Sequence, residues 1–296
     1  MRNGDFHGQE TVIIENDHFQ LECLANAGPR VVRLIPNWLG ENIFAEAPEA
    51  VIRTDLGEYR FFGGHRLWFA PKVVSQTYFP DNHGVTASEA KNGLRLVGGI
   101  EPDTHTRKSI SIQMSPDRPF LMIKHMIKNH GTDPIRLAPN AITMLRPNGV
   151  ALLPQQVGTV DKDGFLPNRN LVFWSYSRWN DPRLKLDHEM IQVSSDGTKR
   201  AFKLGYFNTQ GWLGYVFGDV FFVKRFGVRR DETYPDHGCN AEVYTTDRAL
   251  ELESLGALVD LQPQEELVHT ETWEVYEKNN IPRELLGDKT LDDVLR

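Results

Sequence analysis

The sequence has little cysteine and no long apolar segment. Among its 296 residues are two cysteines, Cys23 and Cys239, which are too few for a disulfide scaffold and fit a reducing, cytoplasmic location. No run of about 18 apolar residues occurs, so no membrane-spanning helix is expected. The first ten residues contain no apolar stretch, so we expect no signal peptide. A net charge of −7 argues against general nucleic-acid binding.

Several catalytic motifs are also missing. The sequence contains no His-Glu-x-x-His, no Cys-x-x-Cys, no phosphate-binding Walker loop and no Gly-x-Ser-x-Gly segment. Phe62-Gly63-Gly64-His65 is not a dinucleotide fingerprint, because no strand–helix–strand unit surrounds it. We therefore expect no cofactor and no metal. The sequence indicates no particular oligomeric state.

What is present is a long series of strand signals. Short segments rich in apolar residues are bounded by Gly, Pro, Asn or Asp, a pattern typical of strands. The segments are 11–15, 18–24, 28–35, 94–97, 108–114, 120–128, 135–138, 142–145, 150–153, 171–174, 201–206, 212–217, 220–226, 240–245, 250–255 and 266–276. They predict an all-β protein, a large antiparallel sandwich or barrel forming one domain over residues 1–296. One short helix is expected within Pro282–Arg296, where Thr290 can cap Leu291–Leu295.

The segment Asn240–Gly256 predicts a hairpin with one acidic face. Two strands, Asn240–Thr245 and Leu250–Leu255, flank the turn at Thr246-Asp247-Arg248. Because side chains alternate along a strand, the face opposite the apolar one carries Asn240, Glu242, Tyr244, Glu251 and Glu253. Like charges placed opposite one another are destabilising, so this concentration of acid indicates a site. A solvated outer face is an equally good interpretation, and Ca²⁺ or Mg²⁺ binding is a weaker one.

A second candidate segment runs from Phe61 to Pro71. A Gly-Gly pair, which permits unusual backbone angles, is followed at once by His65, Arg66 and Trp68. The guanidinium offers several fixed donors and the indole an apolar face, a combination suited to a polyol. The alternative is a loop whose arginine pairs with a carboxylate for structural reasons.

The segment 157–187 is the longest stretch between strand signals. It is rich in Asn, Asp, Arg and aromatic residues, and loops of that length are usually functional or disordered. Trp174, Tyr176 and Arg178 have the residue types of a stacking platform with a hydrogen-bonding rim. A well-packed loop is the alternative.

Three other polar residues stand within apolar strand patterns. Lys203 and Lys224 are each expected on a solvated face, with pairing to a buried carboxylate as the less favoured alternative. His125 shares its face with Leu121, Ile123 and Ile127, so we expect a buried core histidine whose hydrogen bonds are satisfied.

Four segments together resemble the galactose mutarotase-like superfamily, and more closely an uncharacterised bacterial branch related to the aldose 1-epimerases. They are Asn16–Ile35, Gly40–Phe44, Gly63–Trp68 and Leu250–Gly256. The resemblance extends from about residue 10 to about residue 277, leaving 278–296 as a C-terminal tail. It implies a β-supersandwich with a concave cleft for a carbohydrate ligand.

The resemblance also implies roles for individual residues. Aldose 1-epimerases bind sugar hydroxyls with an Asn-Arg pair; His65-Arg66 stands in that place, so Arg66 matches and the Asn does not. Their general-base Glu corresponds to Glu251 or Glu253. Their general-acid His falls within Leu137–Thr143, which contains no histidine, and His65 is our first substitute.

The sequence thus predicts an aldose 1-epimerase-like isomerase, with an acidic cleft favouring neutral aldoses. The remaining substrate-binding candidates are Trp68, Tyr176, Arg178, Asn240, Glu242 and Tyr244. The missing histidine leaves a non-catalytic sugar-binding or sensory module open, and paired carboxylates leave a glycan lyase or hydrolase open.

Overall fold

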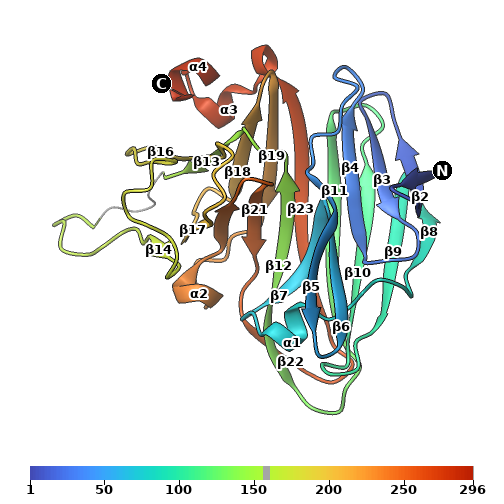
Figure 1. Cartoon of the computed structure of the whole chain (residues 1–296). Coiled ribbons are helices and arrows are strands. Elements are labelled where there is room, and N and C mark those ends of the chain that lie inside the picture. Colours follow the sequence, from blue (N-terminus) through green and yellow to red (C-terminus); the bar gives the residue numbers. More distant parts are fainter. Residues whose placement is uncertain (156–160, 296) are drawn as a thin grey trace.

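A computed structural model describes residues 1–155 and 161–295. Two large antiparallel sheets pack face to face, with short helices at their margins (Figure 1). The predicted all-β antiparallel sandwich is confirmed. None of the helices formed by the described residues has the length and apolar character that a membrane crossing needs.

The first sheet has eleven strands and carries the candidate site. Its strands, in spatial order, are β1 (Arg2–Phe6), β2 (Gln9–Glu15), β3 (Phe19–Leu24), β4 (Arg30–Pro36), β7 (His65–Ala70), β12 (Ile135–Leu145), β21 (Leu250–Leu255), β20 (Ala241–Thr245), β17 (Phe202–Tyr206) and β14 (Val172–Phe173), with β22 (Val259–Leu261) pairing with β12 off this path. The central neighbours β7, β12, β21 and β17 come from distant parts of the chain. Side chains far apart in sequence therefore lie side by side.

The second sheet has ten strands and closes the sandwich. Its order is β15 (Leu184–Lys185), β16 (Met190–Ser194), β13 (Val150–Pro154), β18 (Trp212–Phe217), β19 (Val220–Phe226), β23 (Glu266–Glu277), β11 (Phe120–Asn129), β10 (Thr106–Met114), β9 (Gly93–Ile100) and β8 (Thr86–Ala90). A separate hairpin pairs β5 (Glu46–Thr54) with β6 (Gly57–Gly63). The helices are α1 (Val74–Thr77), α2 (Pro235–Gly238), α3 (Arg283–Leu286) and α4 (Leu291–Leu295), with a 3₁₀ turn at Lys278–Asn280.

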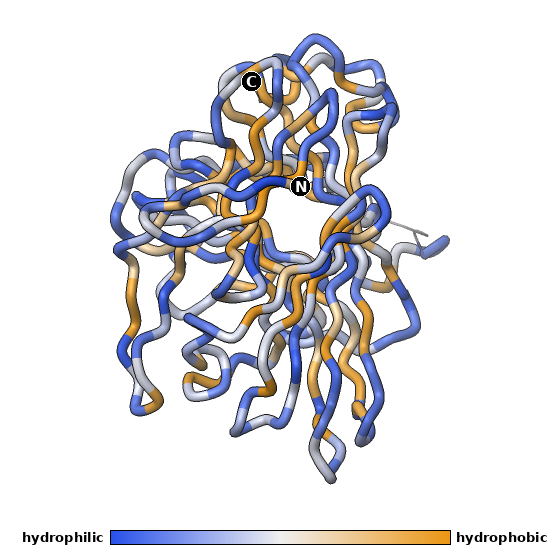
Figure 2. The backbone as a smooth tube through the Cα atoms, turned by 90° about the vertical axis from the view of Figure 1, so that its right-hand side faces the viewer, coloured by the Kyte–Doolittle hydropathy of each residue, from blue (hydrophilic) through white to orange (hydrophobic). Residues whose placement is uncertain are grey.

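The main core fills the space between the two sheets. Phe44, Phe222 and Trp273 meet edge to face there, with ring centroids 5.5 Å apart for Phe44 and Trp273. Figure 2 shows hydrophobic and hydrophilic stretches following one another along the backbone. Burial of these apolar side chains is the main force holding the sheets together.

The sequence prediction for the region of strand β12 was wrong in one respect. We expected separate strands at 135–138 and 142–145, because Pro139 cannot donate to a sheet ladder. The structure has one strand, Ile135–Leu145. On one side its partner changes at this point from β22, opposite Ile135–Leu137, to β21, which begins opposite Asn140. Pro139 lies at the change of partner, where its missing N–H breaks no ladder bond.

The Gly-Gly segment leads into a strand and not into a loop. Gly63 and Gly64 have φ values of 95° and 63°. A Cβ on Gly64 would lie 2.0 Å from the carbonyl oxygen of Val31, so only glycine permits this close approach of two backbones. The close approach fixes the start of β7, and with it the opposite orientations of His65 and Arg66.

The C-terminal segment forms two short helices, α3 and α4, where we expected one. Thr290 caps α4 as predicted, because its hydroxyl accepts a hydrogen bond from the backbone N–H of Asp293 at 3.2 Å. The predicted excursion at 157–187 contains two-residue strands β14 and β15 joined by turns. Residues 156–160 lie outside the described residues.

Candidate functional site

Five neighbouring strands of the first sheet present polar side chains on the surface that faces away from the core. Strand register aligns residues from β7, β12, β21, β20 and β17 in rows across the sheet. One row is Arg66–Ile142–Glu253–Glu242, and the next is Glu251–Tyr244–Lys203. We call the surface formed by these two rows, together with the side chains that pack on them, the outer face. It brings Glu242, Glu251 and Glu253 together, as the hairpin pattern predicted.

The outer face is not a solvated strand surface, so that alternative is wrong. Glu242, Glu251 and Glu253 are 0%, 7% and 1% exposed. These carboxylates can be buried because a cation that we expected on a solvated face, Lys203, is buried with them. Lys203 is buried between two of the carboxylates, with its Nζ 2.5 Å from Glu242 and 2.7 Å from Glu253. Its ammonium supplies the positive charge between these two carboxylates.

Burial and ion pairing distribute charge unequally between the two carboxyls. Burial raises the pKa of Glu242 to about 8, although Lys203 opposes the shift. Against the effect of burial, Lys203 and Lys72 hold the pKa of Glu253 well below its ordinary value. Against burial again, the two carboxylates raise the pKa of Lys203. At neutral pH this group therefore contains an ionised Glu253 and a protonated Lys203, and Glu242 is the carboxyl of the two that takes up a proton more readily.

Glu253 is saturated with hydrogen-bond donors. Lys203 donates to Oε1, while Lys72 and Asn140 both donate to Oε2 at 3.0 Å. A carboxylate with that many donors in a buried position is a fixed anion. Its bonding makes Glu253 a positioning group more than a proton acceptor.

Glu251 is bonded less completely. Arg66 donates to its Oε1 at 3.0 Å, and 10% of the Glu251 side chain is exposed. Arg66 lies over the ring of Trp68 at 4.2 Å, and the Trp68 indole donates to the hydroxyl of Tyr59 at 2.9 Å. Stacking and pairing together hold the guanidinium in one orientation, with its edge toward Glu251.

Aromatic residues cover the charged floor of this face. Trp174 lies over Lys203, with the ammonium 4.5 Å from the ring centroid. Tyr176 and Tyr244 meet edge to face at 6.5 Å, and Tyr78 packs against Trp68 at 5.4 Å. Burial raises the pKa of Tyr244 to about 12 and raises that of Tyr78 and Tyr176. These phenols are neutral hydrogen-bonding groups around the carboxylates.

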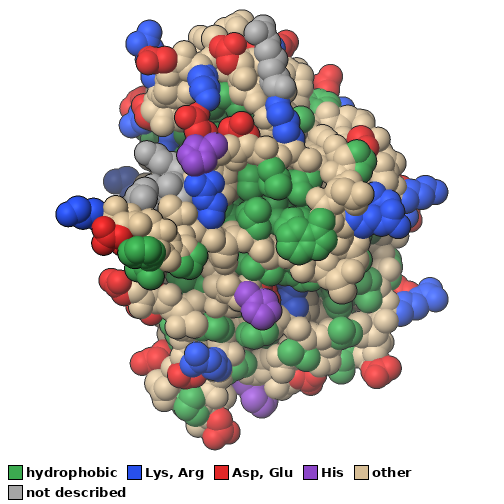
Figure 3. All heavy atoms as spheres, turned by 90° about the vertical axis from the view of Figure 1, so that its left-hand side faces the viewer, with side chains coloured by type: hydrophobic (Ala, Val, Ile, Leu, Met, Phe, Trp, Pro, Cys, Tyr) green, Lys and Arg blue, Asp and Glu red, His purple; other side chains and the backbone are tan. Residues whose placement is uncertain are grey.

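Figure 3 shows the side of the molecule that carries β14 and α2. Hydrophobic side chains gather at its centre, and charged side chains are visible inside a hollow just below them. Tyr176 is 44% exposed, whereas Arg66 and Glu253 are buried. The charged residues of the outer face therefore lie deeper than the aromatic side chain of Tyr176.

Three predicted site residues are placed elsewhere. His65 is wholly buried and points between the sheets, because it alternates with Arg66 along β7. Asn240 is also buried, and its side chain bonds the backbone N–H and C=O of Asn208. Arg178 is an exposed loop residue near Tyr176. The structure therefore groups Arg66, Trp68, Tyr176, Tyr244 and the three carboxylates, without His65 or Asn240.

A second polar cluster lies inside the sandwich, and we call it the inner network. Its members are His65, His125, Thr143, Lys224, Ser254, His269 and Glu271. Lys224 is wholly buried, so its expected solvated position is wrong; it bonds the carbonyls of Ala141 and Leu252 and lies 2.9 Å from Glu271. His125 is a buried, hydrogen-bonded core histidine, as predicted.

Hydrogen bonds define the protonation pattern of the inner network. His125 Nδ1 donates to the carbonyl of His269, which leaves Nε2 to accept from His65 Nε2 at 2.7 Å. Burial lowers the pKa of all three histidines, that of His269 to about 3, so they are neutral. The nitrogens of His65 and His125 and the carboxylate of Glu271 are close enough to hold a metal. The ammonium of Lys224, bonded to Glu271, already supplies a cation there.

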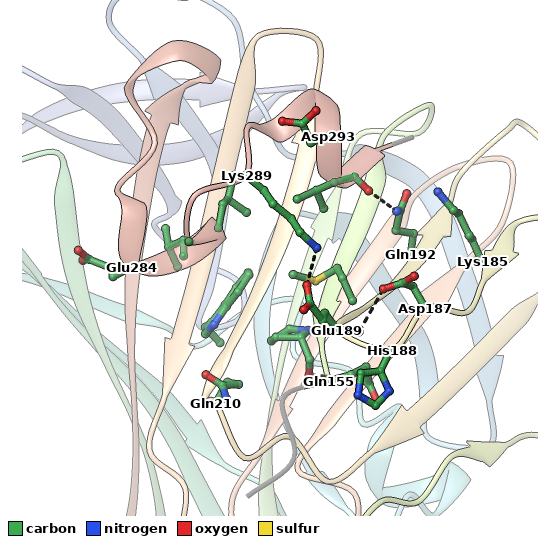
Figure 4. A pocket seen from close by; sticks show the side chains of 17 residues that line it. Gln155, Lys185, Asp187, His188, Glu189, Gln192, Gln210, Glu284, Lys289 and Asp293 are labelled. Atoms are coloured by element: carbon green, nitrogen blue, oxygen red, sulfur yellow. Dashed lines mark hydrogen bonds and ion pairs between the residues drawn. The ribbon is translucent and has the colours of Figure 1, made fainter.

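A cavity lies away from both clusters. It has a volume of about 570 Å³ and lies between α3, α4 and strands β16 and β18 (Figure 4). An ion pair between Lys289 and Glu189 crosses it. Its lining combines apolar side chains from α3, α4 and β18 with ionisable side chains from the segment before β16, among them Asp187 and His188.

Three residues of the outer face were missed in the sequence. Lys72 follows β7 by two positions, Tyr78 ends α1, and Asn140 stands beside the proline in β12. Lys72 directly follows the candidate segment Phe61–Pro71. Its closeness in sequence to Trp68 was the one signal that could have marked it as a site residue. Tyr78 and Asn140 carry no pattern, because only the folded chain brings Tyr78 to Trp68 and only strand pairing brings Asn140 to Glu253.

The sequence by itself finds no relatives: no family model matches it, and neither does any curated protein compared with it. Solved structures do match. A galactose mutarotase-like protein from Lactobacillus casei is 9% identical, has a TM-score of 0.57, and covers 90% of this chain and 100% of its own. A galactose mutarotase related enzyme from Lactobacillus acidophilus is 9% identical with a TM-score of 0.60, covering 90% and 97%. A TPR-domain containing protein from Parabacteroides distasonis is 12% identical with a TM-score of 0.58, covering 96% of this chain and 50% of its own. This chain has the galactose mutarotase-like fold.

Proposed function

We propose that this protein binds an aldose on the outer face and interconverts its two anomers, with Glu251 as the general base. The observation that carries the proposal is the arrangement around Glu251. Its Oε1 is held by Arg66, and within the described residues its Oε2 has no hydrogen-bond donor. A carboxylate that is oriented by one contact and free at its other oxygen is suited to take a proton.

The chemistry around Glu251 suits a sugar. Tyr78, Tyr176 and Tyr244 offer phenolic hydroxyls, and their rings offer apolar surface for C–H bonds. Arg66 presents donors in a fixed plane. Two of the structures with the same fold are named for galactose mutarotase, which agrees with a carbohydrate ligand.

Glu251 is preferred over Glu253 as the base because of their bonding. Glu253 accepts from Lys72, Lys203 and Asn140, and protonating it would break contacts with two cations. Its depressed pKa makes it a weak base. Glu253 would then fix the lysines, and Glu251 would take the proton from the anomeric hydroxyl.

Exchange between anomers, measured by NMR saturation transfer, tests the proposal. The panel should include neutral aldoses, uronates and sugar phosphates. We expect acceleration for at least one sugar and a loss of at least 100-fold in Glu251→Gln, in line with the usual contribution of general-base catalysis. Glu266→Gln, on an exposed position of β23, is the matched control and should keep full activity. An active Glu251→Gln enzyme would refute the role of Glu251.

A non-catalytic sugar-binding module is the second candidate. It is favoured by the outer face itself, where Arg66, Lys72 and Lys203 are all engaged in ion pairs with the carboxylates of Glu251, Glu253 and Glu242. Line broadening of a sugar without any acceleration of anomer exchange would support this function and exclude the first.

A further inference from the structure

We propose that Lys72 is the general acid of the outer face and donates a proton to the ring oxygen of the bound sugar. This inference rests on the proposed epimerase function and adds a catalytic residue to it. Opening of the sugar ring requires a proton for the ring oxygen, and His65, the donor expected from the sequence, faces the interior. Another proton donor is therefore required at this face.

The position of Lys72 fits the role. It lies two residues beyond the end of β7, with its Nζ 3.0 Å from Oε2 of Glu253 and 5.4 Å from the ring centroid of Trp68. Its side chain is 31% exposed, compared with 4% for Lys203 and 2% for Arg66. Among the cations described on this face, Lys72 is the one that a substrate can reach.

The other donors of the outer face are poorly suited. Arg66 does not lose its proton at any ordinary pH. Lys203 is held in its protonated form by Glu242 and Glu253, which raise its pKa. Burial raises the pKa of Tyr244 to about 12, so its hydroxyl is a weak acid.

The charges around Lys72 adjust its acidity. Glu253 of β21 contacts it, Lys203 of β17 and Glu242 of β20 lie behind that carboxylate, and Trp68 of β7 flanks it. Burial lowers the pKa of Lys72 and the Lys203 ammonium acts in the same direction, against the attraction of Glu253. A lysine next to a second cation gives up its proton more readily than a free one.

The reaction step balances as follows. Glu251 takes the proton from the anomeric hydroxyl, and the electron pair of that O–H bond forms the C1=O1 double bond. The C1–O5 bond breaks, and O5 takes the proton from the Lys72 ammonium. The open-chain aldehyde turns about C1–C2, and the two proton transfers reverse on closure. Glu251 and Glu253 stand two residues apart on β21, so their Cα atoms are about 7 Å apart, which lets Glu251 and the Glu253-bound Lys72 flank one sugar ring.

Chemical rescue tests Lys72 directly. Lys72→Arg keeps the charge and the contact with Glu253 but removes the transferable proton. Lys72→Cys can be converted with bromoethylamine into a lysine analogue that carries a more acidic amine. Cys23 and Cys239 are both wholly buried, so the reagent should reach the new thiol alone. Lys91→Arg, in an exposed turn, is the matched control.

We expect Lys72→Arg to bind the sugar, shown by line broadening, and to lose anomer exchange by at least 100-fold. The alkylated Lys72→Cys protein should regain exchange, with the alkaline limb of its pH profile at lower pH than in the wild type. Exchange in Lys72→Arg within twofold of wild type would overturn the role of Lys72 while leaving the epimerase intact. Restored exchange in the alkylated Lys72→Cys protein with an unshifted alkaline limb would also overturn the role of Lys72. A wild type that accelerates no aldose would overturn both proposals.

Discussion

Lys224 Nζ lies 2.9 Å from Oε1 of Glu271, and neither side chain is exposed to solvent. Both residues belong to the second sheet, on β19 and β23. Lys224 also donates to two backbone carbonyls of the first sheet, those of Ala141 and Leu252. Lys224, held in place by this buried ion pair, therefore joins the two sheets through its hydrogen bonds.

Replacing Lys224 should destabilise the protein severely. In Lys224→Met the carboxylate of Glu271 remains buried without its cation, and breaking a buried pair in this way costs about 3–5 kcal/mol. Urea unfolding followed by fluorescence measures the loss. The double variant Lys224→Met, Glu271→Leu should recover part of it, because no unpaired charge remains. Lys185→Met, at an exposed position, should change the free energy of unfolding little.

The neutral histidines of the inner network should make stability fall with acid. His65, His125 and His269 have lowered pKa values in the folded protein, about 3 for His269, against an ordinary value of 6.5. Below about pH 6.5 the unfolded chain takes up protons that the folded one does not, at about 1.4 kcal/mol per pH unit for each histidine. Urea midpoints should therefore fall steadily from pH 7 to pH 5. His269→Gln should flatten the slope and exposed His188→Gln should not; equal midpoints at both pH values would contradict this assignment.

Glu242 should have the opposite pH dependence. Its pKa is raised from 4.5 to about 8, so the folded protein holds a proton that the unfolded chain releases above pH 4.5. The stability it contributes is complete below pH 4.5 and is lost as the pH rises through 8, at about 1.4 kcal/mol per unit. The stability of Glu242→Gln relative to wild type should therefore increase between pH 5 and pH 8. A constant difference, like that expected for exposed Glu266→Gln, would show that Glu242 is ionised throughout.

Two glycines with similar backbone angles should respond differently to alanine. Gly64 and Gly40 have φ values of 63° and 69°, so a Cβ strains both to a similar degree. At Gly64 the added Cβ would also meet the carbonyl oxygen of Val31 at 2.0 Å, whereas nothing lies within 4 Å at Gly40. Gly64→Ala should therefore lose at least about 2 kcal/mol more than Gly40→Ala in urea unfolding. Equal losses would rule out the close approach at the start of β7.

The fold was predictable because its signals are local. Alternation over six residues identifies β21, and it also shows that Glu251 and Glu253 share a face with each other but not with Leu252. Strand β1 escaped notice, because it has little apolar content and no alternation.

The site was predictable only in part, because its contacts are long range. Lys203 and Glu253 are 50 positions apart, and Lys72 and Glu253 are 181 apart. A lysine in an apolar strand has the same local pattern whether it faces water or a buried carboxylate. We therefore expected Lys203 on a solvated face. His65 was chosen as a site residue for its position beside Arg66, although alternation along a strand sends the two side chains to opposite faces.

Strand β21 contributes to both polar clusters of the molecule. Glu251 and Glu253 belong to the outer face, while Ser254 and the carbonyl of Leu252 belong to the inner network. Substitutions at the odd-numbered positions can therefore change which ligand is bound while leaving the join between the sheets intact. Insertion or deletion of a single residue within the strand would exchange the two sets at once. New specificities on this scaffold should arise by point substitution of β21, and changes in its length should be confined to the adjoining turns.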